Sequence, residues 1–386
     1  MTNRPGPSRR SAIRPFIVMD VMRAAADREH AGGRVVHMEV GQPGAGAPAA
    51  VVAAAHAALA DGQLGYTEAL GHRGLRRRIA AHYAEAHGLD VPVERIAVTT
   101  GSSGGFNLAF LAAFDADDRL AVPSPGYPAY RNLAQALDLE VVEIEVDADT
   151  GYLLTPEMLA RVHAETPLKG LLVASPANPT GTIMAPDALR ALIAAAHDLG
   201  ITFISDEIYH RLVYAGTAAT ALQFSSDTIV VNSFSKYYCM TGWRVGWMVL
   251  PEPLVRPVER IAQNLAICAP TISQRAAIAA FDATAELDPI RDGYAASRRL
   301  LIDRLPAIGF GDLFPVDGAF FVYASVTRFA NDSVDFAARM LAEAGVAATP
   351  GADFDGKNGR RFVRFSFAGT EAEVRDGVDR LAHWLK

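Results

Sequence analysis

The chain has few cysteines and few lysines, and both shortages limit what it can be. Its 386 residues include only two cysteines, Cys239 and Cys268, whose separation fits neither metal-ligand spacing nor a disulfide framework. We therefore expect no metal site and a reducing, cytoplasmic location. Only four of the 36 basic side chains are lysines, so arginine serves in this chain wherever a bare positive charge is enough.

An excess of positive charge and long apolar runs are also missing. The formal net charge is −7, which gives no electrostatic footprint for nucleic acid or for an anionic membrane surface. The short run Arg76-Arg77-Arg78 is predicted to be a solvated helix face. Since no apolar stretch is long enough for a signal sequence or a membrane span, we expect small soluble ligands as partners, and neither nucleic acid nor membrane.

From about Val93 onward, short apolar runs alternate with segments of helix length. This alternation is typical of βαβ units, in which a mostly parallel sheet lies between helices. Predicted helices include Phe106–Phe114, Pro156–His163 and Pro186–Leu199. The predicted strands, seven in number, are Ile96–Thr99, Arg119–Val122, Val141–Val146, Gly170–Ala174, Ile201–Ser205, Thr228–Asn232 and Val245–Leu250.

The last hundred residues show a different pattern, with a long helix near Ile290–Leu305 followed by isolated strands and a closing helix. This predicts a second, smaller α+β domain. The opening stretch, with a strand near Val35–Val40, is too short to fold alone and is expected to join that domain. The predicted division is an N-terminal arm with the first part of the small domain at 1–45, a large α/β domain at 46–285, and the rest of the small domain at 286–386.

Glycine and serine follow the first predicted strand of the large domain. The segment Thr100–Gly105, which contains Ser102, Ser103 and Gly104, opens directly into a helix. Free backbone N–H groups and the helix dipole favour a phosphate at such a helix N-terminus. The segment matches neither G-x-G-x-x-G nor a Walker A loop, which disfavours a nicotinamide or nucleoside triphosphate site.

Lys236 lies in the run Asn232-Ser233-Phe234-Ser235-Lys236, directly after another predicted strand. Lysine can lose its proton and attack a carbonyl, whereas a guanidinium stays charged and cannot. A lysine retained in an arginine-rich chain therefore indicates a need for an amine. The hydroxyls of Ser233 and Ser235, with Arg244 shortly after, supply donors suited to a phosphate.

Three further polar residues closely follow predicted apolar strands, which should place them in the interior of the protein. Asn178 follows the strand Gly170–Ala174, and Asp206 and Tyr209 follow Ile201–Ser205. A buried carboxylate is costly unless it meets a cation or strong donors. Arg364 lies inside an apolar strand, where it needs an anionic partner. A helix cap, a proline-rich turn and a structural ion pair are the alternative interpretations.

Taken together, these motifs occur in an order that resembles the class I/II aminotransferases, the fold-type I enzymes that use pyridoxal phosphate (PLP), close to the aspartate aminotransferase branch. The resemblance runs from about Phe16 to the C-terminus. It is carried by Val40-Gly41-Gln42-Pro43, Gly65-Tyr66-Thr67, Asn178-Pro179-Thr180-Gly181, Asp206-Glu207-Ile208-Tyr209, Ser233-Phe234-Ser235-Lys236, Gly242-Trp243-Arg244 and Arg364-Phe365-Ser366-Phe367.

The resemblance implies a PLP-dependent aminotransferase that moves an amino group between an α-amino acid and a 2-oxo acid. Lys236 is expected to hold PLP as an aldimine and then to move the proton from the substrate Cα. Asp206 is expected to pair with the pyridine nitrogen. Tyr209 and Asn178 would bond the phenolic oxygen of the ring, and Tyr127 would stack on it.

The same resemblance implies how the cofactor phosphate and the substrate are held. Arg364 would bind the substrate carboxylate, helped by Asn178 and the backbone of Gly41. Tyr66 would reach the phosphate from a second subunit, which predicts a homodimer. The remaining residues expected to bind the cofactor at its phosphate end are Ser102, Ser103, Gly104, Ser233, Ser235 and Arg244.

The substrate side chain is less defined by the sequence than the cofactor chemistry. In the family that the chain resembles, some relatives acting on dicarboxylic substrates place a lysine in the phosphate turn, at a position that corresponds to Ser103 here. Phe16, Ile17, Tyr127 and residues 264–269 are expected to line the side-chain pocket, which favours an aliphatic or aromatic donor. A β-eliminating C–S lyase of the same fold remains the alternative, because the Lys236–Asp206 pair serves either chemistry.

Overall fold

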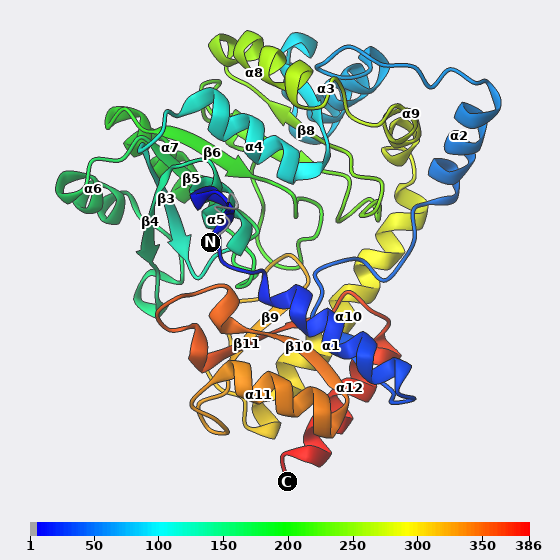
Figure 1. Ribbon diagram of the computed structural model, residues 1–386, viewed down its shortest axis with the longest axis vertical. Coiled ribbons are helices and arrows are strands. Elements are labelled where there is room, and N and C mark those ends of the chain that lie inside the picture. Colours follow the sequence, from blue (N-terminus) through cyan, green and yellow to red (C-terminus); the bar gives the residue numbers. More distant parts are fainter. Residues whose placement is uncertain (1–5) are drawn as a thin grey trace, which may run out of the picture.

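The computed structural model describes residues 6–386, which form two β-sheets with helices on both faces of each (Figure 1). The large sheet has seven strands, and all neighbours are parallel except β8, which runs antiparallel to β2 and β7. Its order is β2 (Ile96–Thr99), β8 (Gly246–Val249), β7 (Ile229–Ser233), β6 (Thr202–Asp206), β5 (Gly170–Ala174), β3 (Arg119–Ser124) and β4 (Glu140–Glu145). The predicted fold class and its seven strands are confirmed.

Both faces of the large sheet are buried under helices. Since successive side chains of a strand point to opposite faces, neighbouring residues of one strand join different cores. Leu171 and Phe203 join the apolar core shared with one set of helices, α3 (Arg73–His87), α6 (Pro156–Glu165), α7 (Pro186–Asp198) and α9 (Thr271–Ala280). Their chain neighbours Leu172 and Ile204 join the core formed with the other set, α4 (Gly101–Ala113), α5 (Pro128–Ala136) and α8 (Glu252–Leu265).

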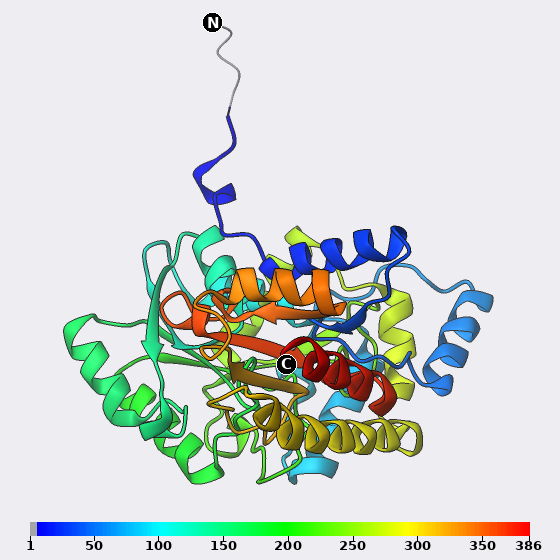
Figure 2. The ribbon, with the colours of Figure 1, turned by 90° about the horizontal axis from the view of Figure 1, so that it is seen from below.

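The second sheet combines the two ends of the chain. Val36 of β1 pairs with Val346 of β10 in parallel, so the strand predicted near Val35–Val40 does join the C-terminal strands. Figure 2 shows α1 (Ile17–His30) and α11 (Ser333–Arg339) on one face, and α10 (Thr284–Ile308) and α12 (Glu371–Trp384) on the other. The strand order is β1 (Val36–Met38), β10 (Val346–Pro350), β11 (Phe362–Ser366) and β9 (Phe321–Ser325).

Several details differ from the sequence-based expectations. Helix α4 begins at Gly101 and not near Phe106, so the glycine-rich segment is the first turn of the helix itself. Helix α10 begins at Thr284, earlier than expected, and the domain boundaries at residues 45 and 285 stay predictions. Arg76 is not solvated: it is buried in α3 and bonds backbone carbonyls. Among the described residues, no helix is both long and apolar enough to cross a membrane.

The core beneath β8 gives a test of the fold. The Trp247 ring packs against Phe234 and Phe281, and its N–H donates to the Tyr83 hydroxyl at 3.2 Å. Trp247→Ala is expected to lower the free energy of unfolding by about 3–5 kcal/mol, because it leaves a cavity in a packed core. Urea unfolding followed by circular dichroism measures this. Val334→Ala, at a position 40% exposed, should cost less than about 0.5 kcal/mol, and equal losses in the two variants would contradict the assignment.

Candidate active site

A cavity of about 220 Å³ lies between the carboxyl ends of the strands of the large sheet and the second sheet. This is the edge at which open α/β sheets bind ligands. Eleven of the fourteen predicted site residues line it, and their roles stay predictions. They are Gly41, Ser102, Ser103, Tyr127, Asn178, Asp206, Tyr209, Ser235, Lys236, Arg244 and Arg364.

Lys236 projects into this cavity from the turn that follows β7. Its ammonium group donates to the Gly41 carbonyl at 2.6 Å, which links the large sheet to the segment after β1. Burial, together with the nearby charge of Arg364, lowers the pKa of Lys236 to about 8. A lysine with this pKa has a substantial neutral fraction near neutral pH and is therefore able to act as a nucleophile or a base.

Asp206 ends β6 and faces the same cavity. One carboxylate oxygen accepts the Ile208 N–H at 3.0 Å, and the other accepts the Tyr130 hydroxyl. Burial raises the pKa of Asp206 to about 6, although both hydrogen bonds act in the opposite direction. The buried carboxylate lacks a bonded cation among residues 6–386, so a protonated ring nitrogen would be a favourable ligand.

Tyr130 was missed by the sequence analysis, which gave the segment after Pro125 a single site residue, Tyr127. Both side chains line the cavity, and their rings meet edge to face at 5.3 Å. The three-residue spacing at the start of α5 was the available signal, because residues i and i+3 share a helix face. Tyr209, also buried, packs edge-on against Phe320 and Phe321.

The N-terminus of α4 forms the second part of the site. Thr100, at the N-cap position, makes no side-chain capping hydrogen bond, so the first N–H groups of the helix remain available to an anion. Arg244 lies beside Gly101, where a Cβ would come within 2.5 Å of the guanidinium. Ser102, Ser103 and Ser235 line the cavity here. Together these groups offer hydrogen-bond donors and one positive charge at a single end of the cavity.

Two predicted phosphate ligands do not line the cavity. Ser233 is buried behind Ser235, and its hydroxyl oxygen lies 2.9 Å from the Ser235 hydroxyl and 3.3 Å from the Val245 carbonyl, either of which can accept its one proton. Ser233 therefore orients Ser235 and does not face the ligand site. Gly104 lies in the first turn of α4 against the Thr100 hydroxyl, which leaves no room for a side chain.

Arg364 reaches the cavity from β11 of the second sheet. Its guanidinium donates to the Asn178 side-chain oxygen at 3.0 Å and to the Glu39 carbonyl at 2.5 Å. The rings of Phe321 and Phe354 lie 4.2 and 4.6 Å from its central carbon. Burial lowers the pKa of Arg364 to about 10. Because it makes no salt bridge within residues 6–386, it presents an unneutralised charge to a carboxylate ligand.

The expected side-chain pocket is only partly as predicted. Phe16 and Tyr127 do line the cavity, but Ile17 and residues 264–269 do not. The N-terminal helix supplies the missing wall through Val18, Met19 and Met22. Tyr66 also lies away from this cavity, and its side chain is 81% exposed.

The comparisons with known proteins agree with the fold. The model of the aminotransferase class I and II family matches residues 34–381. The valine–pyruvate aminotransferase of Mycobacterium tuberculosis is 50% identical over 380 residues, which cover 97% of each chain. The crystal structure of an aminotransferase from Mycobacterium tuberculosis is similar with a TM-score of 0.97, at 49% identity and 99% coverage of both chains.

A more distant structure is similar over the same length. The aspartate aminotransferase of Thermus thermophilus with maleate has a TM-score of 0.93 at 32% identity, covering 98% of this chain and 100% of its own. The fold and the site thus define a fold-type I aminotransferase. The chain belongs to the aminotransferase class I and II family, whose members move an amino group between an amino acid and a 2-oxo acid.

The lowered pKa of Lys236 can be measured directly in ligand-free protein. We expect Lys236 to react with an amine-selective acylating reagent with a midpoint near pH 8. Lys357 is an internal comparison, since its ion pair with Glu145 raises its pKa. Mass spectrometry of the labelled peptides across a pH series gives both midpoints. A Lys236 midpoint at or above that of Lys357 would contradict the site electrostatics.

Proposed function

We propose that the protein is a PLP-dependent aminotransferase that takes its amino group from an apolar α-amino acid, in a homodimer. The observation that carries the proposal is the placement of a buried low-pKa lysine between a buried carboxylate and an anion-binding helix terminus. These three features fit the aldehyde, the ring nitrogen and the phosphate of PLP. When bound, PLP supplies an electron-accepting ring that stabilises negative charge at the substrate Cα.

Each polar group of the cavity has a distinct task in this proposal. Asp206 would hold the proton of the ring nitrogen, with Tyr130 fixing the carboxylate. Lys236 would bind the aldehyde and, once released by the substrate amine, would take the proton from Cα. Tyr209 and Asn178 would donate to the ring oxygen, and Tyr127 would cover one ring face.

The phosphate would be bound at the N-terminus of α4. Its ligands would be the N–H groups and hydroxyls of Ser102 and Ser103, the Ser235 hydroxyl and the Arg244 guanidinium. A dianion is favoured there by the helix dipole and by the positive charge of Arg244. Gly104 is the fourth residue of α4 and follows the three positions whose N–H groups have no partner within the helix.

The substrate end of the cavity combines one charged group with an apolar wall. Arg364 would grip the α-carboxylate, with Asn178 and Gly41 beside it. Phe16, Val18 and Met22 offer no cation for a second carboxylate, and Ser103 stands where dicarboxylate-binding relatives have lysine. An apolar donor therefore fits best. The likeness to the valine–pyruvate aminotransferase supports valine as donor and pyruvate as acceptor.

The homodimer is supported by an apolar surface. Helix α2 (Ala49–Ala60) contains only alanine, valine and leucine apart from His56, and three of its residues are buried. A helix that is apolar all round requires burial on more than one side. Val52 and Leu59 are 40% and 54% exposed, and Ala54 and Ala57 of the same helix line a surface pocket with Tyr66. A second copy of the chain would cover them. The cytoplasmic location stays a prediction, based on the two cysteines.

The proposed reaction is tested by incubating the purified protein with PLP, pyruvate and a panel of single amino acids. With valine as the donor, we expect equal amounts of alanine and of the 2-oxo acid derived from valine, measured by chromatography. Aspartate should give much less alanine. Lys236→Ala should abolish transfer, because no other residue among those described carries the required amine into the cavity. Lys169→Ala is the matched control, since Lys169 is exposed. Pyruvate and ammonia formed from a donor without any acceptor would instead identify a lyase.

The role of Arg364 is tested by Arg364→Met. We expect kcat/KM for the amino donor to fall about ten- to hundredfold, as loss of a charge-assisted pair implies. Arg364→Lys should recover only part of this, because a lysine cannot bind a carboxylate bidentately. Arg360→Met, which removes an exposed arginine paired with Asp332, is the control for charge. Unchanged steady-state constants in Arg364→Met would make Arg364 a structural residue.

A further inference from the structure

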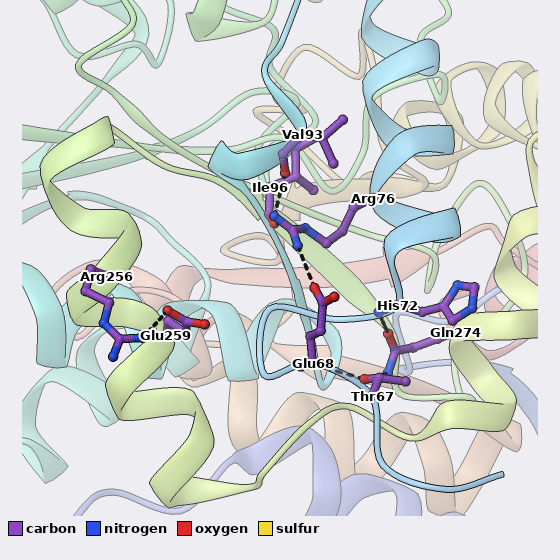
Figure 3. Close-up of polar contacts among 9 residues, drawn as sticks. All are labelled: Thr67, Glu68, His72, Arg76, Val93, Ile96, Arg256, Glu259 and Gln274. Carbon is purple, nitrogen blue, oxygen red and sulfur yellow. Dashed lines mark hydrogen bonds and ion pairs between the residues drawn. The ribbon is translucent and has the colours of Figure 1, made fainter.

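Two segments predicted to contribute to the active site lie away from the cavity of their own chain. The first carries Tyr66 in the connection between α2 and α3, and the second is 264–269, just before α9. Both are tied to one buried side chain, Gln274 of α9, which has no exposed surface. Figure 3 shows Gln274 beside Thr67 and His72.

The Gln274 amide makes a hydrogen bond to each segment. Its oxygen accepts the His72 N–H at 2.6 Å. Its nitrogen donates to the Thr67 hydroxyl at 3.2 Å and to the Ala269 carbonyl at 2.7 Å. Both amide hydrogens and one oxygen site are therefore used. A methyl, carboxylate or hydroxyl group could not accept one hydrogen bond and donate two at the same time, so the position requires an amide.

Neighbouring residues of α9 hold the same connection at other points. The Thr271 hydroxyl donates to the Gly65 carbonyl at 2.7 Å, which is the peptide directly before Tyr66. Arg275 forms an ion pair with Asp61 and also donates to the Gln63 carbonyl. Three side chains of one helix thus fix the backbone on both sides of Tyr66.

A second anchor comes from α3. The buried Arg76 donates to the carbonyls of Ile96 and Val93 at 2.9 and 2.8 Å, and its remaining nitrogen reaches Glu68 at 3.2 Å (Figure 3). Gly71 is held with φ +98°, and its Cα faces Val98 and the Gln274 oxygen so closely that a Cβ would come within 2.5 Å of Val98. The connection therefore lies in one defined path against α9 and β2.

The fixed segments present an apolar surface outward. Tyr66, Leu265 and Ile267 are 81%, 61% and 45% exposed, and side chains of α9 bond the backbone at Gly65, directly before Tyr66, and at Ala269. Backbone support below large exposed apolar side chains fits an interaction surface, because an ordered backbone has less conformational freedom to lose on binding. The surface is continuous with α2, which packs on α9.

From this arrangement we infer that Gln274 is a positioning residue for the active site of the partner subunit. It holds Tyr66 and residues 264–269 of one chain in a fixed relative position. In the dimer, both segments would then contact the cavity of the other chain. The inference rests on the proposed PLP-dependent homodimer and extends it, since it assigns the trans contribution to one amide that contacts neither cofactor nor substrate.

Mixed dimers with one competent site test whether Gln274 acts across the interface. The first pairs a Gln274→Met chain, which keeps Lys236, with a Lys236→Ala chain, which keeps Gln274. Its only competent cavity then receives segments held by an intact Gln274. The second pairs a wild-type chain with a chain carrying both substitutions, so the competent cavity receives segments without that support. Different affinity tags on the two chains allow each mixed dimer to be purified.

The expected results differ between the two mixed dimers. The Gln274→Met homodimer and the second mixed dimer should lose about tenfold in kcat/KM per competent site, as expected for unpaired buried groups. The first mixed dimer should match a wild-type/Lys236→Ala dimer. Borohydride reduction followed by mass spectrometry gives a readout independent of turnover, because it reports the fraction of Lys236 joined to PLP at each PLP concentration. Half-occupancy should require more PLP only where the partner lacks Gln274.

Impairment of the first mixed dimer, or full activity of the Gln274→Met homodimer, would overturn the inference. If Gln274→Met does not fold, Gln274→Glu serves in the same design, since it keeps the size and the acceptor for His72 but loses both donors. Failure of the proposed function gives a different result: the Lys236→Ala homodimer would then be active, or the wild-type protein would show no amino transfer.

Discussion

The structure depends on three buried charges that do not neutralise one another. Lys236, Asp206 and Arg364 line one cavity, and burial shifts the pKa of each toward its neutral form. No salt bridge joins any two of them within the described residues. Pairing these charges with one another would reduce the cost of burying each one but would leave no free charge for a ligand. Their separation therefore costs stability, which the two packed sheets offset.

Strand geometry determines which groups enter the cavity. Ala174 of β5, Asp206 of β6 and Val231 of β7 are in register across the parallel strands, so the residues that follow these strands reach the same edge. Glu207 directly follows β6, and because successive side chains alternate, its carboxylate points to the opposite face of the sheet from that of Asp206. Glu207 is buried there, accepts from Ser205, Thr220 and the Ala221 N–H, and has its pKa raised to about 7 by burial. One of two adjacent acids thus serves the cavity and the other serves the core.

Local patterns in the sequence were sufficient for the large sheet and for most of the cavity, because apolar runs followed by polar residues mark buried strands and their ends. They failed where the outcome depends on tertiary packing. Ser233 and Ser235 differ by two positions, yet only Ser235 faces the cavity. Arg76 was predicted to be solvated because it lies in a run of three arginines, but it is buried and donates to two backbone carbonyls. Helix α2 was not assigned because it has no polar face and hence no periodicity.

The same limit applies to the residues that lie away from the cavity. The cavity of a single chain contains Lys236, Asp206 and Arg364 beside the N-terminus of α4, but Tyr66 lies exposed on a connection that α9 holds. A side chain without a binding role does not need an ordered backbone beneath it. Burying an amide such as Gln274 is costly unless the amide is fully hydrogen-bonded, so its use to order this connection calls for an explanation. In the proposed homodimer, the ordered backbone beside Tyr66 and its exposed side chain have a common physical explanation, because the connection would be held in the shape that a second copy of the chain requires.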